Sequence, residues 1–351
     1  KVIIFGFIFT FFSSFGQSFF LGLFNAPIRN ELDISHGQFG TIYATATICS
    51  SLLLIWVGKK IDDFKLINYS FFVIVLLAAS SFLFSMINSV YILAAGIFLM
   101  RFSGQGLMSH TSTTAISRYF DKTRGKALSA IWFGLSSAEF ILPIVITYLL
   151  VIFSWNIIWQ GISLIVIIFL PIVIFYSIRN IKLDTREEKS LEIPLTKIKN
   201  WRRSEIIKDF KFYIVSLNML AGPWIITGIF VYQSFISESK VWSQFAIPKA
   251  FMIYSITSIL SLLLSGILVD KFTSRKLISF VNIPLLLSMI SLFMIQDEIG
   301  AYIFLGLIGI SNGLANVLGS STWAEIYGVK YIGSIKALTT ALMVFSTAFG
   351  T

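Results

Sequence analysis

Long apolar runs dominate this sequence of 351 residues and confine most of the chain to lipid. A helix needs about 20 apolar residues to cross the hydrocarbon core of a bilayer. The runs lack the alternating pattern of a membrane β-barrel, so the sequence predicts an all-α, multi-pass membrane protein. We expect eleven spans, at 2–24, 38–57, 69–88, 91–117, 126–150, 152–178, 211–234, 247–268, 277–295, 301–323 and 333–351.

The composition excludes several other classes of protein. Only 13% of the residues are charged, about half of the roughly 25% that is typical of soluble domains. The net charge of +10 is spread over short loops, which argues against a nucleic-acid-binding face. The single cysteine, Cys49, excludes an intramolecular disulfide and a cysteine-ligated metal cluster. We therefore expect no cofactor and no metal.

Basic residues gather in alternate loops and predict the orientation of the chain. The loops after the second, fourth, eighth and tenth runs are rich in lysine and arginine, whereas the opposite loops hold only Arg29, Lys240 and Lys249. Because positive loops remain inside, we expect a cell (inner) membrane protein with a cytoplasmic N-terminus. The basic loops contain Lys59, Lys60, Lys65, Arg118, Lys122, Arg124, Lys126, Lys271, Arg275, Lys276, Lys330 and Lys336.

A polar segment at 179–210 interrupts the short loops and divides the chain. It predicts an N-terminal six-helix bundle at 1–178, a cytoplasmic linker, and a C-terminal bundle at 211–351 with five helices. Ile198, Trp201 and Ile206 among basic residues suggest a helix at the inner membrane surface. A solvated linker explains the same pattern equally well.

An internal repeat joins the two parts. A glycine, an aspartate and a phenylalanine recur at the same spacing after a displacement of 208 residues, and the same offset pairs Tyr119 with Tyr327 and Gly125 with Gly333. A repeat of about six spans is typical of transporters that are built from two halves. The repeated residues are Gly58, Asp62 and Phe64 in the first copy and Gly266, Asp270 and Phe272 in the second.

The repeated loop resembles the signature of the major facilitator superfamily, in which an acidic residue follows a glycine by four positions and basic residues come next. The resemblance implies two pseudo-symmetric six-helix bundles, with the last helix missing from this chain. Glycine allows helix ends to approach closely, and a carboxylate there can cap a neighbouring helix. We expect a conformational latch, with solvated loop charges as the alternative. Its residues are Gly58, Asp62, Gly266, Asp270 and Glu325.

A second loop is distantly similar to one branch of that superfamily. The residues from Arg118 to Leu128 place Tyr119-Phe120 before a basic cluster, which resembles the loop after the fourth span of monocarboxylate and oxalate/formate porters. This resemblance implies a carboxylate as substrate.

Two charges lie inside the apolar runs. Arg101 begins a segment similar to the facilitator span-four signature, and Glu139 lies in the fifth run. A charge at the bilayer centre costs about 2.5–3.5 kcal/mol, so such residues are functional candidates. At a helical rise of 1.5 Å per residue their depths, about 25 Å and about 21 Å from the inner boundary, allow them to pair. The pair either fixes two helices, or Arg101 holds an anionic substrate while Glu139 carries a coupling proton.

Other polar residues within the runs are weaker candidates. His110 is either a proton relay or a hydrogen-bonded structural histidine. Gly222-Pro223-Trp224 is expected to interrupt the seventh run and bend it. A shared cavity can be lined by Gln17, Asn218, Trp224, Asn312 and Asn316, although each alone is more often a helix-contact residue.

These features favour a secondary active transporter. We expect a monomeric symporter that moves a small organic anion, such as a carboxylate, by alternating access with protons as the coupling ion. A facilitator for an uncharged or cationic metabolite is the alternative. A membrane-embedded enzyme would need a cluster of reactive side chains, which this sequence does not supply. A channel does not fit a two-fold internal repeat. The Walker sequence is absent, as is the glycine-proline pair of multidrug exporters.

Overall fold

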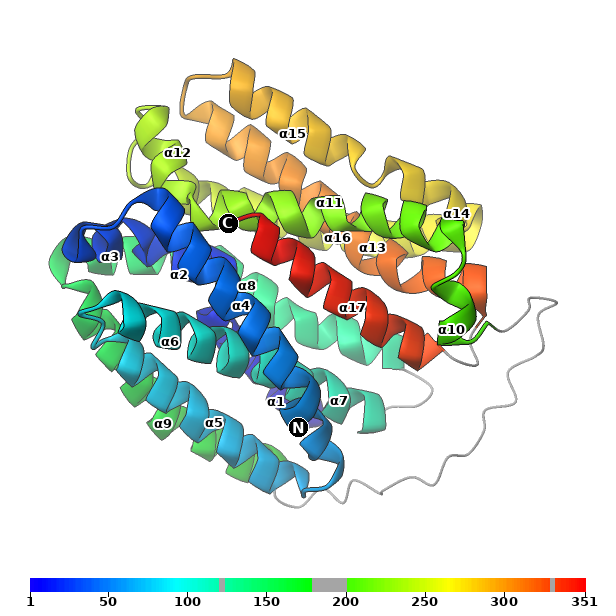
Figure 1. Cartoon of the computed structure of the whole chain (residues 1–351), viewed down its shortest axis with the longest axis horizontal. Coiled ribbons are helices and arrows are strands. Elements are labelled where there is room, and N and C mark those ends of the chain that lie inside the picture. Colours follow the sequence, from blue (N-terminus) through cyan, green and yellow to red (C-terminus); the bar gives the residue numbers. More distant parts are fainter. Residues whose placement is uncertain (120–123, 179–200, 329–331) are drawn as a thin grey trace. The chain divides into compact units, whose positions relative to one another are not determined.

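The computed structural model describes residues 1–119, 124–178, 201–328 and 332–351, and all regular elements in these ranges are helices (Figure 1). The prediction of an all-α chain is confirmed. Nine helices in the described ranges are long and apolar enough to span a bilayer. A tenth span is formed by Val2–Gly16 and Ser18–Leu32, which are bent by 45° at a break. The eleventh predicted run, 333–351, corresponds to α17.

The first part of the chain contains six spans, and the 3-10 segment Lys60–Asp62 lies between the second and the third. The first span is divided into five elements, and a π-helical stretch divides the fourth span. The elements are α1 Val2–Ser13, η1 Ser14–Gly16, α2 Ser18–Leu21, η2 Gly22–Phe24, α3 Asn25–Leu32, α4 His36–Lys59, η3 Lys60–Asp62, α5 Leu66–Phe84, α6 Val90–Met100, η4 Arg101–Met108, α7 Ser109–Tyr119, α8 Arg124–Ile152 and α9 Trp155–Ile178.

The second part contains four further spans among the described residues, and α17 follows them. The elements are α10 Arg203–Ile206, α11 Phe210–Val231, α12 Gln233–Ser239, α13 Ala246–Phe272, α14 Ser274–Leu277, η5 Ile278–Phe280, α15 Ile283–Met294, α16 Ile299–Tyr327 and α17 Ile332–Phe349. Helix α11 continues through Gly222, Pro223 and Trp224, so the interruption expected there is wrong. Neighbouring helices and small backbone adjustments let a membrane helix tolerate a proline.

The internal repeat is visible in the helix boundaries. Tyr119 is the last described residue of α7, and Tyr327, 208 residues later, is the last residue of α16. The helices α5 and α14 also begin 208 residues apart, at Leu66 and Ser274. The offset found in the loop residues therefore also relates the starts of these two helices.

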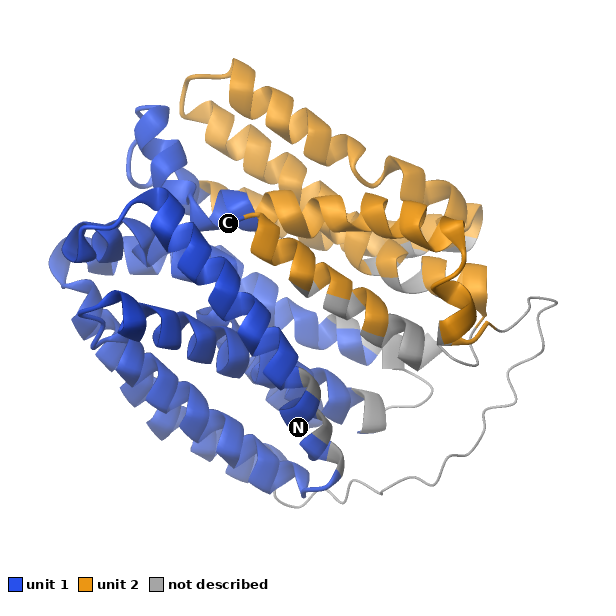
Figure 2. Ribbon diagram, in the orientation of Figure 1, with its two compact units in different colours: residues 1–183, 227–249, 351 blue, residues 184–226, 250–350 orange. Residues whose placement is uncertain are grey.

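Contacts divide the chain into two compact units (Figure 2). Unit 1 contains residues 1–183, 227–249 and 351, and unit 2 contains residues 184–226 and 250–350. In unit 1, α1 packs against α7, α8 and η4, while α5 packs against α6 and α9. In unit 2, α16 packs against α14, α15 and α17. The division at 1–178, 179–210 and 211–351 remains a prediction from span order.

Candidate functional site

The first span breaks in its middle, at Gln17. Ser14–Gly16 form a 3-10 turn, Gln17 is extended with φ −82° and ψ 152°, and α2 begins at Ser18. The backbone amide of Gln17 donates to the Ser14 carbonyl over 2.9 Å. Irregular backbone at membrane depth is tolerated only where protein or water satisfies it, so the break marks a candidate site.

The fourth span is also irregular where it meets this break. Arg101–Met108 form the π-helical stretch η4, between the α-helical segments α6 and α7. π-Helical turns are rare and are frequently found at functional sites. Since η1 packs against η4, two distorted backbones contact one another inside unit 1.

Two glycines make this contact possible. A Cβ atom at Gly104 would lie 2.6 Å from the Gly16 nitrogen, and a Cβ at Gly16 would overlap the Met100 carbonyl and the Gln105 amide. Only glycine allows backbones to approach so closely. The close approach of spans one and four therefore requires glycine at both positions.

Arg101 lies at this contact and is only 2% exposed. Its Nη1 donates to the Gly16 carbonyl and to Ser18 Oγ, each over 3.2 Å. The guanidinium carbon lies 5.4 Å from the centre of the Tyr43 ring, and Tyr43 OH donates to Ser18 Oγ over 3.0 Å. We call Gly16, Gln17, Ser18, Tyr43 and Arg101 the arginine seam.

The arginine seam is incompletely satisfied. Arg101 Nε is buried without an acceptor among the described residues. A buried donor without a partner costs free energy. The arginine seam can therefore gain stability from one more hydrogen-bond acceptor at Arg101 Nε. Sequence reasoning found Arg101 and Gln17 but missed Ser18 and Tyr43. The polar cluster Gly16-Gln17-Ser18 inside an apolar run was the available signal for the first of these, whereas Tyr43 had none.

Glu139 is buried in α8, at 7% exposure, and α8 packs against α1. The hydrogen bonds described for Arg101 go to the break of the first span. An Arg101–Glu139 pair remains a prediction.

The polar candidates of unit 2 lie between helices. Asn218 Nδ2 donates to the Ile278 carbonyl over 2.8 Å, and Asn282 Nδ2 donates to Asn218 Oδ1 over 2.8 Å, which holds the irregular segment between α14 and α15. Asn312 Nδ2 donates to Tyr254 OH over 2.9 Å. These contacts give Asn218 and Asn312 structural partners, while the shared cavity remains a prediction.

The other two candidates of unit 2 are exposed. Trp224 is 53% exposed and donates from Nε1 to the Phe349 carbonyl over 3.0 Å. Asn316 is also exposed. A role for either in binding a substrate stays a prediction.

His110 contacts the end of the second span. Its Nε2 lies 3.0 Å from the Gly58 carbonyl oxygen, which joins α7 to α4. A Cβ at Gly58 would lie 3.5 Å from the His110 ring, an ordinary van der Waals separation. The hydrogen-bonded partner agrees with the structural interpretation of His110, and the proton relay remains a prediction.

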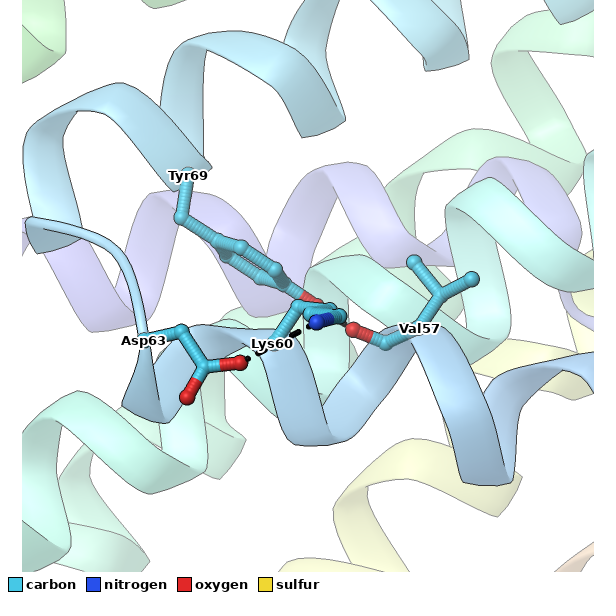
Figure 3. A network of polar contacts seen from close by, with 4 residues as sticks. All are labelled: Val57, Lys60, Asp63 and Tyr69. Carbon is cyan, nitrogen blue, oxygen red and sulfur yellow. Dashed lines mark hydrogen bonds and ion pairs between the residues drawn. The ribbon is translucent and has the colours of Figure 1, made fainter.

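We call the loop with Gly58 and Asp62 the first Gly–Asp corner and the loop with Gly266 and Asp270 the second, and two local contacts are described at the first. Lys60 Nζ pairs with Asp63 Oδ2 over 3.3 Å, and Tyr69 OH donates to the Val57 carbonyl over 3.1 Å (Figure 3). Both charged side chains are more than half exposed, so the pair contributes little to stability. The side chains of Asp62, Gly266 and Asp270 lie outside the described residues.

Glu325 contacts the loop that follows the second corner. Its carboxylate accepts hydrogen bonds from the backbone amides of Ser274, over 3.0 Å, and Arg275, over 3.2 Å, at the start of α14. Burial alone would raise the pKa of the Glu325 carboxyl, but the bonds from Ser274 and Arg275 outweigh it and hold that pKa below its ordinary value. These bonds join α16 to α14, and the role of Glu325 in a latch remains a prediction.

The end of the linker packs against α11 and α16. Trp201 donates its backbone amide to the Tyr327 carbonyl over 3.0 Å, and Tyr327 OH donates to Asp209 Oδ2 over 3.0 Å. Ile206 is fully buried beside Trp323 and Tyr327. The described end of the segment is therefore part of the core of unit 2, and residues 179–200 lie outside the described ranges.

Unit 1 contains a further contact that the sequence did not suggest. Asn25 Nδ2 donates to the Val231 carbonyl over 2.7 Å, and Gln233 Nε2 donates to the carbonyls of Phe19, over 2.8 Å, and Phe230, over 3.0 Å. The last carbonyls of a helix lack intrahelical partners, so these amides cap the end of α11. A Cβ at Gly22 would overlap the Phe230 carbonyl.

Comparisons with known proteins agree with this architecture. A family model described as Major Facilitator Superfamily matches residues 6–351. A bacterial homologue of the human lysosomal transporter Spinster, inward-facing and occupied, is similar with a TM-score of 0.72 and 13% identity, over 99% of this chain and 78% of that chain. Its unoccupied form is similar with a TM-score of 0.70 and 13% identity, over 99% of this chain and 79% of that chain. A variant of the nucleoside transporter NupG is similar with a TM-score of 0.74 and 11% identity, over 99% of this chain and 89% of that chain.

At these identities the solved structures show a shared fold alone. A search of curated protein sequences finds no match.

Proposed function

This chain belongs to the major facilitator superfamily, a family of small-solute membrane transporters, and we propose that it carries a small organic anion together with protons. It is accordingly a multi-pass transporter and not an enzyme. The anion, such as a carboxylate, and the proton coupling are our inference. So are alternating access, a monomeric state, an inner-membrane location and a cytoplasmic N-terminus.

The buried arginine carries this proposal. Arg101 is 2% exposed, and its described acceptors are the neutral oxygens of Gly16 and Ser18. A guanidinium matches a carboxylate through two parallel hydrogen bonds, which are stronger than bonds to neutral oxygens. An anionic solute would thus satisfy both the charge and the unpaired Nε.

Glu139 supports the coupling part of the proposal. It is a buried acidic residue in α8, next to α1. Ionisable groups within membrane spans often belong to proton pathways. In our proposal the carboxyl binds a proton when a substrate anion occupies Arg101, because the arginine then no longer stabilises a second negative charge.

The latch belongs to the same proposal. Gly58, Asp62, Gly266, Asp270 and Glu325 would favour one conformation and release it in the other. The bond from Glu325 to the start of α14 supports this role for one member.

The test is uptake by purified protein in proteoliposomes. Acetate, lactate, succinate and benzoate are offered with and without an inward proton gradient, and counterflow separates a carrier from a channel. We expect a carboxylate to be accumulated by wild type and lost in Arg101→Gln, and we expect Glu139→Gln to uncouple uptake from the gradient. Undiminished uptake by Arg101→Gln, or uptake of none of the four carboxylates, overturns the proposal.

A further inference from the structure

The break in the first span makes its backbone and side-chain oxygens available as hydrogen-bond acceptors for Arg101. In a continuous helix the Gly16 carbonyl would accept from the backbone amide of Phe20, four residues later. Here the Phe20 amide instead donates to the Gln17 carbonyl over 3.2 Å. The carbonyl of Gly16 therefore faces the guanidinium because the helix is broken, and the arginine in turn stabilises the break.

We propose that the break at Gln17 is an anion-responsive hinge, in which Gly16 O and Ser18 Oγ occupy Arg101 until the carried anion displaces them. This inference rests on the proposed function, since it takes the anion at Arg101 as given. Beyond that function, it names the groups that bind the arginine when no anion is present, and it names the break of the first span as the element that is released when the anion replaces them.

Bond strengths favour such an exchange. Both resting bonds measure 3.2 Å, which is longer than the roughly 2.7–2.9 Å of a bond from a guanidinium to a carboxylate. Both resting bonds come from the same nitrogen, Nη1, so a carboxylate oxygen that binds Nη1 can replace the carbonyl and the hydroxyl there. Once it does, hydrogen bonds between Arg101 and the first span no longer hold the break.

The surroundings of the seam permit movement. Gly16 and Gly104 contact one another through backbone atoms alone, so no side chains interlock across that contact. Tyr43 lies under the guanidinium at 5.4 Å, and a cation–π contact does not use the hydrogen-bonding edge of the arginine. Tyr43 thus positions Arg101 in both states, whereas Ser18 binds it only in the resting state.

A first experiment tests the hinge without any substrate. Gln17→Cys in a Cys49→Ser background is labelled with neutral N-ethylmaleimide, with and without Ser18→Ala. We expect Ser18→Ala to raise the labelling rate about tenfold, the factor that about 1.4 kcal/mol gives. The matched control is Ser112→Ala, because Ser112 is also buried and also joins the fourth span to the first, by donating to the Gly6 carbonyl over 2.9 Å.

The control is expected to change the labelling rate less than twofold. Equal rates in the Ser18→Ala and Ser112→Ala proteins would mean that the seam does not hold the break, and would overturn the hinge whatever the substrate is.

A second experiment tests the exchange and needs no introduced cysteine. Binding of acetate, lactate, succinate and benzoate is measured from the stabilisation of purified protein. We expect Ser18→Ala to bind the stabilising carboxylate severalfold more tightly than wild type, because a competing acceptor is gone. Weaker or unchanged binding overturns the exchange. If none of the carboxylates stabilises wild type, the proposed function fails, and the labelling rates still decide whether the hinge exists.

Discussion

The two halves of the repeat differ in chemistry at the positions of the arginine seam. A displacement of 208 residues takes Ser18 to Ile226, Tyr43 to Phe251 and Arg101 to Gly309. The hydroxyls and the charge of the first half are thus replaced by apolar residues and a glycine. The backbone differs too, since the fourth span contains η4 whereas α16 is α-helical from Ile299 to Tyr327.

The equivalent position in the second half serves packing. A Cβ at Gly309 would overlap the Tyr254 carbonyl and the Thr257 hydroxyl of α13. Thr257 Oγ1 also donates to the Gly306 carbonyl over 2.8 Å. The repeat therefore supplies two similar scaffolds, and the buried cation of the first stands where the second has a glycine. In our proposal the duplicated fold thus places the anion-binding group in one half.

Removing the charge should show this asymmetry most strongly. We expect Arg101→Gln to weaken carboxylate binding by about a hundredfold, because bonds between charged partners are worth about 1.5–3 kcal/mol each. Gly309→Ala changes the matched position of the second half. In the fraction of this variant that folds, the affinity for the carboxylate should stay within about threefold of the wild-type value. Titration of purified protein with the transported carboxylate measures both. Similar losses in the two variants would contradict the comparison.

Adding a methyl group should destabilise both halves alike. Gly104→Ala and Gly309→Ala each introduce a Cβ into occupied space, and overpacking costs about 1–3 kcal/mol. The control is Gly161→Ala in α9, where no atom lies within 4 Å of the added Cβ. It should be neutral or stabilising by up to about 1 kcal/mol, because alanine favours helix over glycine. Thermal unfolding in detergent compares the three variants.

The cap on α11 should have a smaller effect. Gln233 is 3% exposed and donates to two carbonyls, so Gln233→Ala leaves buried acceptors unpaired at a cost of about 1–2 kcal/mol. Ser239→Ala removes a bond at an exposed site and should change stability by less than about 0.5 kcal/mol. Equal melting temperatures for the two variants would contradict the capping role.

The smallest expected effect is the pH response of Glu325. Its pKa lies below the ordinary value of 4.5, so the carboxylate contributes stability above that pH and loses the contribution as pH falls through the lowered pKa. Wild type should therefore be more stable than Glu325→Gln at neutral pH, and the difference should shrink in acid. A difference that grows as the pH falls would have the wrong sign.

Sequence patterns predicted the spans well because hydropathy alone determines which segments enter a bilayer. The ten spans found among the described residues correspond to ten of the predicted runs. Arg101 and Glu139 were recognised because charges are conspicuous in apolar runs, and both are buried. The family followed from the repeated corner, and the family model agrees with it.

Backbone irregularities were predicted poorly. The expected interruption at Pro223 lies within a continuous helix, and the real break lies at Gln17. Proline changes local bonding, but surrounding helices decide whether the chain bends. The partners Ser18 and Tyr43 were missed because tertiary neighbours leave no periodic signal in one sequence. The carboxylate substrate and the proton coupling also stay predictions, because hydropathy does not encode them.

The π-helical stretch has a mechanical consequence for the fourth span. A π turn holds more residues than an α turn, so each residue advances the helix by a smaller angle. If Arg101–Met108 rewound to α geometry, α7 would rotate about its axis, and His110 would swing away from the Gly58 carbonyl that it now contacts. A change in the winding of this short segment would thus couple Arg101 to the first Gly–Asp corner.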